Sequence, residues 1–320
     1  MQLCPACHAD SINSLEAIHL EFQHSLYAPC SESSQDDLTN LVGLSDRKYL
    51  MQCCQSCGLE FALPLKAPCS EWYEKAYSLL SLYPSSRWEF DYVIKKLKST
   101  DTVGEIGCGA GTFIEKCQLN DIACHGIDFS SSAISHCLER GLPASLINVT
   151  AADLEIAFQG DLRSAIFSAH TLEHLDDPSQ LFDLARKWST NSAVLWISIP
   201  SNRRASRLFG EVDFLDQPPH HLTRWSPSSL EAIGHTSGWL LEEVIYEPIS
   251  LRTILWSYVT RLVLYKKLYN YIGYRNIWLD RLLRYMSYPL AAVKYSTAST
   301  KITGFSMLAR YSKIKSDSLC

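Results

Sequence analysis

The stretch Val103-Gly-Glu-Ile-Gly-Cys-Gly-Ala-Gly-Thr-Phe113 decides the fold of this chain of 320 residues. An apolar run leads into closely spaced glycines, and a segment of helical periodicity follows them. Glycine allows a tight turn beside a ligand, and the N–H groups at the start of a helix attract anions. A second apolar run ends at Asp128, 21 residues after Gly107, where a carboxylate can accept both hydroxyls of a ribose. The stretch therefore predicts a strand, a turn and a helix that bind an adenosine-containing cofactor.

Residues 99–250 around this stretch alternate short apolar runs with amphipathic ones. The runs TVGEIG, ACHGID, SLINV, AIFSAH and AVLWISI have the composition of strands buried on both faces, and helical periodicity fills the segments between them. Such alternation predicts βαβ units and therefore an α/β fold with a parallel sheet. Hydrophobic residues make up 47% of the chain, which excludes a mainly disordered protein.

The spacing of the glycines indicates which class of cofactor the loop binds. The dinucleotide fingerprint G-x-G-x-x-G/A would place its third glycine at Thr112, but the chain has G-x-G-x-G, preceded by Glu105. This Glu-x-Gly-x-Gly-x-Gly string resembles motif I of the class I S-adenosylmethionine-dependent methyltransferases. A carboxylate at Glu105 suits a cofactor whose methionine end carries an ammonium and a sulfonium group instead of a pyrophosphate.

Three further motifs follow in order. Residues 168–178, SAHTLEHLDDP, resemble the LEHL.DP signature of a large methyltransferase subgroup, and residues 218–227, PPHHLTRWSP, resemble its PPHHL loop. Asp153 and Leu154 follow the third strand, where such enzymes place an acidic residue against the adenine amino group. The resemblance implies a Rossmann-like seven-stranded sheet of order 3-2-1-4-5-7-6 with the last strand antiparallel. It assigns cofactor binding to Glu105, Gly107, Cys108, Gly109, Gly111, Asp128, Phe129, Asp153, Leu154 and His170.

Three histidines are candidates for the general base. Methyl transfer from a sulfonium needs a well-positioned nucleophile, and a hydroxyl or acidic C–H acceptor must also lose a proton. His170 ends the fourth strand at the edge where this fold carries its sites. His220 and His221 lie in the loop after the fifth strand. His170 and His221 rank equally and His220 third, and each has the alternative of a hydrogen-bonded wall residue.

A metal alternative exists at the same place. Glu173 and His174 begin the next helix, where their carboxylate and imidazole can fix the loop and cap backbone donors. His170, Glu173 and His174 together could instead bind Mg²⁺, although this ion prefers oxygen ligands.

Twelve cysteines without a recognisable signal peptide favour metal sites or free thiols in a reducing compartment. Two C-x-x-C pairs near the start of the chain have the spacing of zinc knuckles, and together they complete a tetrahedron. The run YLMQCCQSCGLEF, residues 49–61, resembles a module that often precedes this methyltransferase subgroup. We expect one structural Zn²⁺ bound by Cys4, Cys7, Cys54 and Cys57. The alternative is incidental cysteines in a reduced protein.

The net charge of −5 hides an uneven distribution. Residues 251–320 carry ten net positive charges, and the rest of the chain carries fifteen net negative ones. The segment 251–300 is also rich in Tyr, Trp and Leu. It suits a helical lid over substrate or a second subunit, a helix on an anionic membrane surface, or a pocket for a nucleotide or lipid diphosphate.

These patterns divide the chain and predict its function. The resemblance implies a methyltransferase acting on a small molecule or saccharide, including nucleotide- or lipid-linked sugars of surface polysaccharide or secondary metabolism. An RNA methyltransferase and a catalytically silent zinc-containing assembly module are the alternatives, although no RNA-binding module is recognisable. We expect a cytoplasmic protein, which would be peripheral on the inner face of the membrane if the basic segment binds lipid. A homodimer is compatible with the sequence. The expected parts are a zinc module (1–69), a helical linker (70–98), the methyltransferase core (99–250), the basic insertion (251–300) and the last strand (301–313).

Overall fold

The computed structural model describes residues 3–27, 32–80, 86–147, 161–211, 213–262, 267, 277–298 and 301–314. The chain forms two compact units. The core unit comprises Met1–Pro200, Asp213–Ile245 and Met307–Cys320, and the insertion unit comprises Ser201–Val212 and Tyr246–Ser306. The cysteine-rich segment and the cofactor-type sheet therefore belong to one unit.

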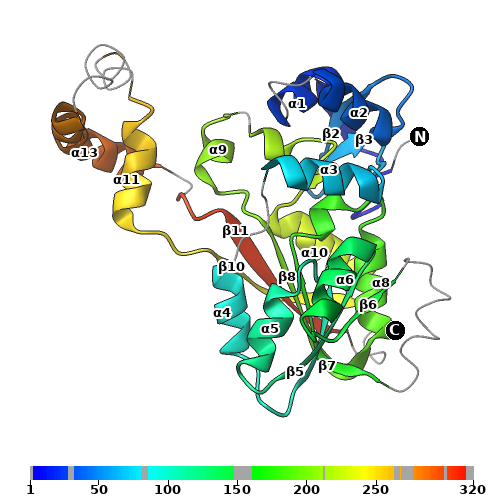
Figure 1. Cartoon of the computed structure of the whole chain (residues 1–320). Coiled ribbons are helices and arrows are strands. Elements are labelled where there is room, and N and C mark those ends of the chain that lie inside the picture. The colour runs from blue at the N-terminus through cyan, green and yellow to red at the C-terminus, as the bar shows by residue number, and fades with distance from the viewer. Residues whose placement is uncertain are drawn as a thin grey trace. The chain divides into compact units, whose positions relative to one another are not determined.

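A seven-stranded sheet forms the centre of the core unit (Figure 1). Its spatial order is β6-β5-β4-β7-β8-β11-β10. Counted along the chain within this sheet, the order is 3-2-1-4-5-7-6, which is the order expected from the sequence. The strands are β4 (Thr102–Ile106), β5 (Ala123–Asp128), β6 (Ala144–Leu146), β7 (Arg163–Ala169), β8 (Ser189–Pro200), β10 (Trp239–Tyr246) and β11 (Ser306–Lys313).

The directions of the strands bring their carboxyl ends together. The pairs β4–β5, β4–β7, β5–β6 and β7–β8 are parallel. Hydrogen bonds run from Ser201 N to Phe305 O at one end of β11 and from Lys313 Nζ to Ser189 O at the other. The chain segment of β11 therefore runs antiparallel to β8.

Aromatic residues fill the core between the sheet and its helices. The rings of Phe113 and Phe167 lie 4.2 Å apart between centroids, and the ring of Phe90 contacts both. Burial of such large side chains contributes most to the stability of a domain. Helices α4 (Trp88–Ile94), α5 (Thr112–Gln118) and α6 (Ser131–Glu139) contribute to this core. Helices α8 (Ser179–Lys187) and α10 (Pro227–Thr236) contact Tyr311 of β11.

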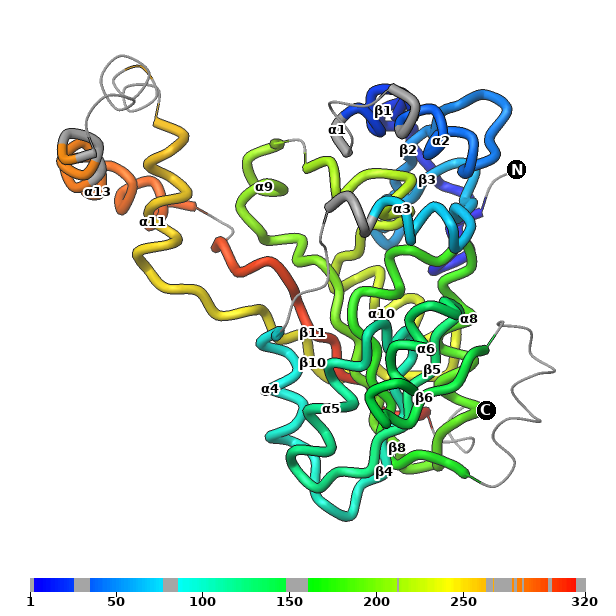
Figure 2. Tube along the Cα trace, in the orientation of Figure 1, coloured from blue at the N-terminus to red at the C-terminus, as the bar shows by residue number. Residues whose placement is uncertain are grey.

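The N-terminal module has a sheet of its own, of order β1-β2-β3-β9, and Figure 2 follows the chain from this module in blue into the larger sheet. Strands β1 (Ile12–His19), β2 (Lys48–Cys54) and β3 (Glu60–Leu63) pair antiparallel. The fourth strand, β9 (Thr223–Arg224), comes from the PPHHLTRW loop of the methyltransferase-like region. Helices α1 (Leu20–Tyr27), α2 (Glu32–Val42) and α3 (Ser70–Leu80) complete the module and the expected helical linker. Residues 81–85 of that linker lie outside the described residues.

The insertion unit is helical. It contains α9 (Ala205–Leu208), α11 (Leu251–Val259) and α13 (Ile277–Thr297). A small apolar core of its own includes Ile254, Tyr258, Val259, Ala291 and Ile302. Over the described part of the chain, no helix has the length and apolar character needed to cross a membrane.

Candidate active site

The glycine loop leaves β4 with three glycines at positive φ. Gly107, Gly109 and Gly111 have φ of 76°, 49° and 77°. At Gly107 a Cβ atom would lie 2.1 Å from Thr171 Oγ1, so even an alanine would collide there. The loop therefore requires glycine for its backbone conformation and for the close approach of the segment after β7.

Asp128 closes the loop from the end of β5. Its Oδ2 accepts a hydrogen bond of 2.8 Å from Gly109 N, and its Oδ1 accepts one of 2.9 Å from Ser130 N. Burial raises the pKa of this carboxyl, although the backbone N–H donors partly oppose that effect. The contacts hold the carboxylate beside the glycine loop, where a ribose would lie in this fold.

Glu105 is the acidic residue of the glycine string, and its side chain is buried at 3% exposure. Its Oε2 has no hydrogen-bond partner among the described residues. Burial raises the pKa of Glu105 well above the usual range, and Cys117, Cys137 and Asp128 add to the effect. A buried carboxyl in this state favours a cationic or hydrogen-bond-donating partner.

His170 lies between two buried carboxylates. Its Nδ1 lies 3.1 Å from Glu173 Oε1, and its Nε2 lies 3.3 Å from Glu89 Oε1. Burial lowers the pKa of His170, but the two carboxylates outweigh that effect and raise it above the usual value. The backbone of His170 is left-handed, with φ of 53°. The side chain is therefore rigidly held and favours the imidazolium form.

Three further imidazoles converge at the same edge of the sheet. His174, from the turn η1 (Leu172–His174), meets His220 and His221 of the PPHHL loop, and their ligand atoms all lie within 4.8 Å of one another. His220 and His221 are each 5% exposed. Burial lowers the pKa of His174 and lowers that of His220 well below the usual value. These two side chains are therefore neutral at neutral pH.

The N-terminal module holds the histidine loop in place. Ala62 N donates to Leu222 O over 2.8 Å, and Arg224 Nη1 lies 3.0 Å from Glu60 Oε2. The following helix α10 is attached as well, because Ser228 Oγ donates to Cys57 O. The position of His220 and His221 thus depends on residues more than 150 positions earlier in the chain.

The four expected zinc ligands come together in the module. Cys4 Sγ lies 3.6 Å from Cys57 Sγ, Cys7 Sγ lies 3.5 Å from Cys54 Sγ, and all four sulfurs lie within 4.8 Å. About 3.8 Å is the separation that tetrahedral Zn–S bonds of ~2.3 Å require.

The two knuckles have the same turn. His8 N donates to Cys4 O, and Gly58 N donates to Cys54 O, with φ of 59° at His8 and 73° at Gly58. His8 therefore takes the place in the first turn that glycine takes in the second.

The other residues expected to bind the cofactor differ in burial, and two of them are not described by the structure. Cys108 is buried, and Phe129 is 44% exposed with its ring against Tyr73. Asp153 and Leu154 lie outside the described residues. Sequence reasoning missed Glu89 and Asp216, since neither belongs to a motif. Asp216 Oδ1 lies 3.3 Å from His221 Nδ1.

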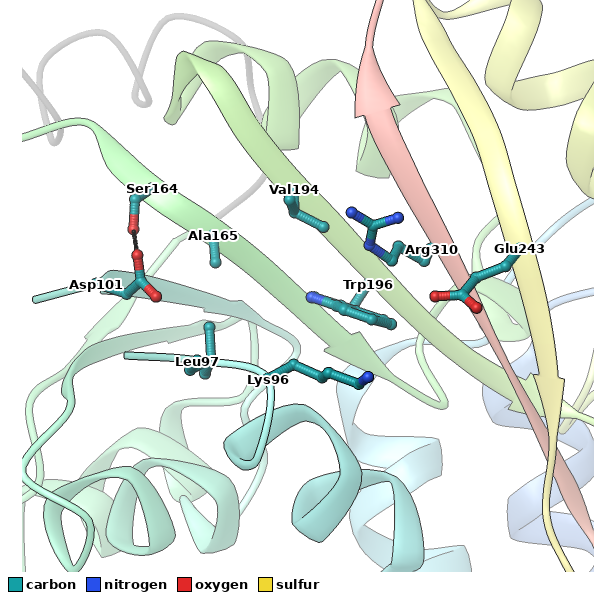
Figure 3. A pocket seen from close by; sticks show the side chains of 9 residues that line it. All are labelled: Lys96, Leu97, Asp101, Ser164, Ala165, Val194, Trp196, Glu243 and Arg310. Carbon is teal, nitrogen blue, oxygen red and sulfur yellow. Dashed lines mark hydrogen bonds between the residues drawn. The ribbon is translucent and has the colours of Figure 1, made fainter. Parts of the chain in front are cut away.

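A separate cavity of about 370 Å³ lies on the core unit (Figure 3). Asp101 and Ser164, joined by a hydrogen bond of 3.0 Å, precede β4 and begin β7. They lie at the amino ends of the strands, opposite the glycine loop. Sites of this fold lie at the carboxyl ends, so this cavity is not the candidate active site. Its lining consists of Lys96, Leu97, Asp101, Ser164, Ala165, Val194, Trp196, Glu243 and Arg310.

Part of the chain is similar to a known family of domains. Residues 88–244 match the model of a methyltransferase domain family. That segment carries the glycine loop, Asp128 and all four clustered histidines. The match and the mostly parallel seven-stranded sheet support an S-adenosylmethionine-dependent methyltransferase in general. No curated protein matches the chain.

Several solved structures are similar in fold at low identity. A SAM-dependent methyltransferase from Archaeoglobus fulgidus is 15% identical with a TM-score of 0.46, over 70% of this chain and 91% of that one. One from Aquifex aeolicus is 20% identical with a TM-score of 0.39, over 49% and 83%. The phosphoethanolamine N-methyltransferase 2 of Haemonchus contortus is 16% identical with a TM-score of 0.43, over 71% and 53%.

Proposed function

We propose that the protein transfers a methyl group from S-adenosylmethionine to a small-molecule or saccharide acceptor. The observation that carries this proposal is the closed arrangement of the glycine loop and Asp128 within the matched segment. Both oxygens of Asp128 keep a further lone pair for the ribose hydroxyls. The buried Oε2 of Glu105, which lacks a described partner, suits the cationic methionine end.

The cofactor when bound supplies a methyl group already activated on a sulfonium. In this proposal the chain contributes Glu105, the backbone of Gly107 to Gly111, Asp128 and the wall formed by Phe129 and His170. Asp153 and Leu154 would contact the adenine. The protein's own work is to bind, orient and exclude water, because positioning alone supplies much of the rate of such a displacement.

The acceptor's proton requires a base, for which His170, His221 and His220 remain the candidates. His170 favours its protonated form, which suits holding an anionic or partly negative acceptor oxygen rather than removing a proton. The neutral His220 suits proton removal better. His221 is oriented by Asp216, in the manner of a base held by a carboxylate.

We further propose that Cys4, Cys7, Cys54 and Cys57 bind a structural Zn²⁺. The convergence of four sulfurs from two matching turns supports this assignment. Four thiolates leave no open position, so this ion would hold the module together and take no part in the reaction.

A second proposal concerns the insertion unit, which we infer rests on an anionic membrane surface. Helix α13 exposes apolar side chains at helical spacing, each between 53% and 73% exposed: Trp278, Leu282, Tyr285, Met286, Leu290 and Val293. The segment 251–300 has eight Lys and Arg but a single acidic residue, Asp280. An apolar stripe with cationic neighbours is complementary to a negatively charged lipid surface. Lipid-linked saccharides are the acceptors that such a location favours.

Vesicle sedimentation tests the membrane proposal. We expect binding to phosphatidylglycerol-containing vesicles that salt weakens, and little binding to phosphatidylcholine alone. Met286→Glu should abolish binding, whereas Ser296→Glu, at an exposed polar position of the same helix, should keep most of it. If the wild type does not bind vesicles, or if Met286→Glu changes only the oligomeric state of the protein, the exposed face of α13 would instead be a subunit interface.

Isothermal titration with S-adenosylmethionine tests the enzyme proposal. Asp128→Ala should weaken cofactor binding by at least 100-fold, and Asp183→Ala, an exposed carboxylate on α8, should not. Equal affinity of Asp128→Ala and wild type, or no binding at all, would favour the silent assembly module. A methyl-transfer screen over nucleotide sugars, lipid-linked saccharides and RNA then separates the acceptors, because RNA binding would fall steeply with salt.

A further inference from the structure

His174, His220 and His221 form a nearly regular triangle of imidazoles. Their ring centroids lie 5.0 Å (His174 to His220), 4.8 Å (His174 to His221) and 4.7 Å (His220 to His221) apart. Three rings bound tetrahedrally to one ion, with metal–nitrogen bonds of ~2.0–2.1 Å, have centroids about 5 Å apart. The described geometry is therefore close to that of a three-histidine metal site.

The outer contacts of two of these histidines fix the tautomer that a metal needs. His174 Nδ1 lies 2.6 Å from the carbonyl oxygen of His220, which can only accept, so Nδ1 carries the hydrogen. His221 Nδ1 faces Asp216 Oδ1 at 3.3 Å and donates in the same way. Each ring then keeps a lone pair on Nε2. Metal-binding histidines characteristically donate their other N–H to a carbonyl or a carboxylate.

A negative charge lies close enough to offset that of an ion. Glu173 is buried, and its Oε1 lies 3.9 Å from His221 Nε2. Its Oε2 has no hydrogen-bond partner among the described residues. A buried carboxylate beside a cluster of imidazoles lowers the cost of placing a divalent cation there.

We propose that His174, His220 and His221 bind a divalent transition-metal ion, with Zn²⁺ as the expected occupant. Imidazole nitrogens favour zinc and its neighbours over Mg²⁺, which prefers oxygen ligands. The site differs from the cysteine site in its ligands and in offering three of them rather than four among the described residues, as catalytic zinc sites do. His170 lies outside it, because two carboxylates hold both of its nitrogens.

The role of the ion rests on the proposed methyl transfer. An acceptor hydroxyl bound at the fourth position would have its pKa lowered and would lose its proton to solvent water. The oxygen so held would take the methyl group, so that a C–O bond forms as the cofactor's C–S bond breaks and S-adenosylhomocysteine leaves. His220 and His221 would then act as metal ligands, and neither would serve as a free base. The acceptor class that suits this chemistry is a sugar or other alcohol whose hydroxyl is otherwise too weakly acidic.

Metal content and cobalt spectroscopy of the untagged chain test the proposal. We expect two bound ions per chain after loading with Zn²⁺ or Co²⁺. Only one Co²⁺ should show thiolate charge-transfer absorption, since the second has nitrogen ligands. His220→Gln and His174→Gln should each lose the ion without that absorption and keep the other. Asp216→Asn should bind the second ion ~10–100-fold more weakly, as loss of an outer partner does.

The exposed His136→Gln on α6 is the matched control and should keep both ions. A wild type in which every bound Co²⁺ shows thiolate absorption, or a His220→Gln variant that keeps an ion without that absorption, would overturn the proposal. Cofactor titration of the same samples separates this proposal from the enzymatic one. A chain that binds the second ion but no S-adenosylmethionine would support the metal site and contradict the proposed methyltransferase activity. A chain that binds S-adenosylmethionine but no second ion would support the activity and contradict the metal site.

Discussion

Ser228 Oγ donates a hydrogen bond of 2.9 Å to the backbone carbonyl oxygen of Cys57. Cys57 belongs to the second cysteine knuckle, and Ser228 to the first turn of α10, which follows the histidine loop. Together with the pairing of β3 and β9, this bond makes the cysteine module a support for His220 and His221. The zinc ion that we propose for this module should therefore influence the histidine cluster without touching it.

Cys54→Ser should prevent binding of the proposed structural zinc and loosen the histidine loop. Zinc binding by four thiolates contributes directly to folding, so we expect a destabilisation of several kcal/mol. Amide hydrogen exchange of residues 220–224 should become faster together with that of the knuckles. Mass-spectrometric exchange and metal analysis measure the two effects. Cys69→Ser changes an exposed cysteine outside the knuckles and should alter neither. Zinc loss with unchanged exchange in the loop would show that the two parts are independent.

Gly107→Ala should destabilise the protein more than Gly141→Ala. Both glycines have positive φ, 76° and 70°, which costs a side chain about 1–2 kcal/mol. A Cβ atom on Gly107 also meets Thr171 Oγ1 at 2.1 Å, whereas one on Gly141 meets nothing within 4 Å. Chemical denaturation measures the difference, which we expect to exceed ~1 kcal/mol in favour of Gly141→Ala. Equal losses of unfolding free energy in the two variants would mean that the segment after β7, which carries Thr171, moves aside without an energetic cost. Cofactor affinity should fall only in Gly107→Ala.

Glu89→Gln should lower the pKa of His170. Burial alone lowers the pKa of this imidazole, and the carboxylates of Glu173 and Glu89 reverse the effect. Removing one charge while keeping the shape of the side chain should shift the pKa downward by about one unit or more. NMR titration of the histidine ring protons follows the shift. Glu139→Gln, an exposed change on α6, is the control. An unchanged titration of His170 would assign its protonation to Glu173 alone.

The parallel sheet could be predicted because each strand and helix has a strong local pattern, whereas the order of its strands was implied only by the family resemblance. The glycine loop and Asp128 could be found because their spacing follows from the strand–turn–helix geometry itself. Glu89 could not be found in this way. Glu89 lies in the short sequence WEFDYVI, and nothing in this sequence distinguishes a buried glutamate from an exposed one. Only the fold brings its carboxylate close to His170.

Strand β9 shows a second limit of sequence reasoning. It has two residues, too few for any periodicity, and it pairs with a strand more than 150 residues earlier. The histidine cluster depends on this pairing. The sequence suggested that His174 fixes the loop or joins His170 in a magnesium site. Its Nδ1 does bond the carbonyl oxygen of His220, and its ring also lies close to those of His220 and His221, which no sequence pattern indicated.

His24 should make the stability of the protein depend on pH. Trp72 Nε1 donates to His24 Nε2 over 3.1 Å, and Nδ1 lies 2.8 Å from Thr39 Oγ1, whose own hydrogen goes to Gln35 O. Both ring nitrogens are therefore committed to the neutral form, and burial lowers the pKa of His24 to about 4. Its contribution to stability is complete above the unfolded pKa of ~6.5 and is lost as the pH falls toward 4.

At pH 5 the free energy of unfolding should be about 2 kcal/mol smaller than at pH 7.5 on account of His24 alone, because the unfolded chain binds the proton more tightly. Urea denaturation at both values measures the total change, and other groups contribute to it. His24→Phe removes the titration, so its unfolding free energy should be lower at pH 7.5 but should fall less between the two values. The same fall in both proteins would mean that the folded chain accommodates a protonated His24.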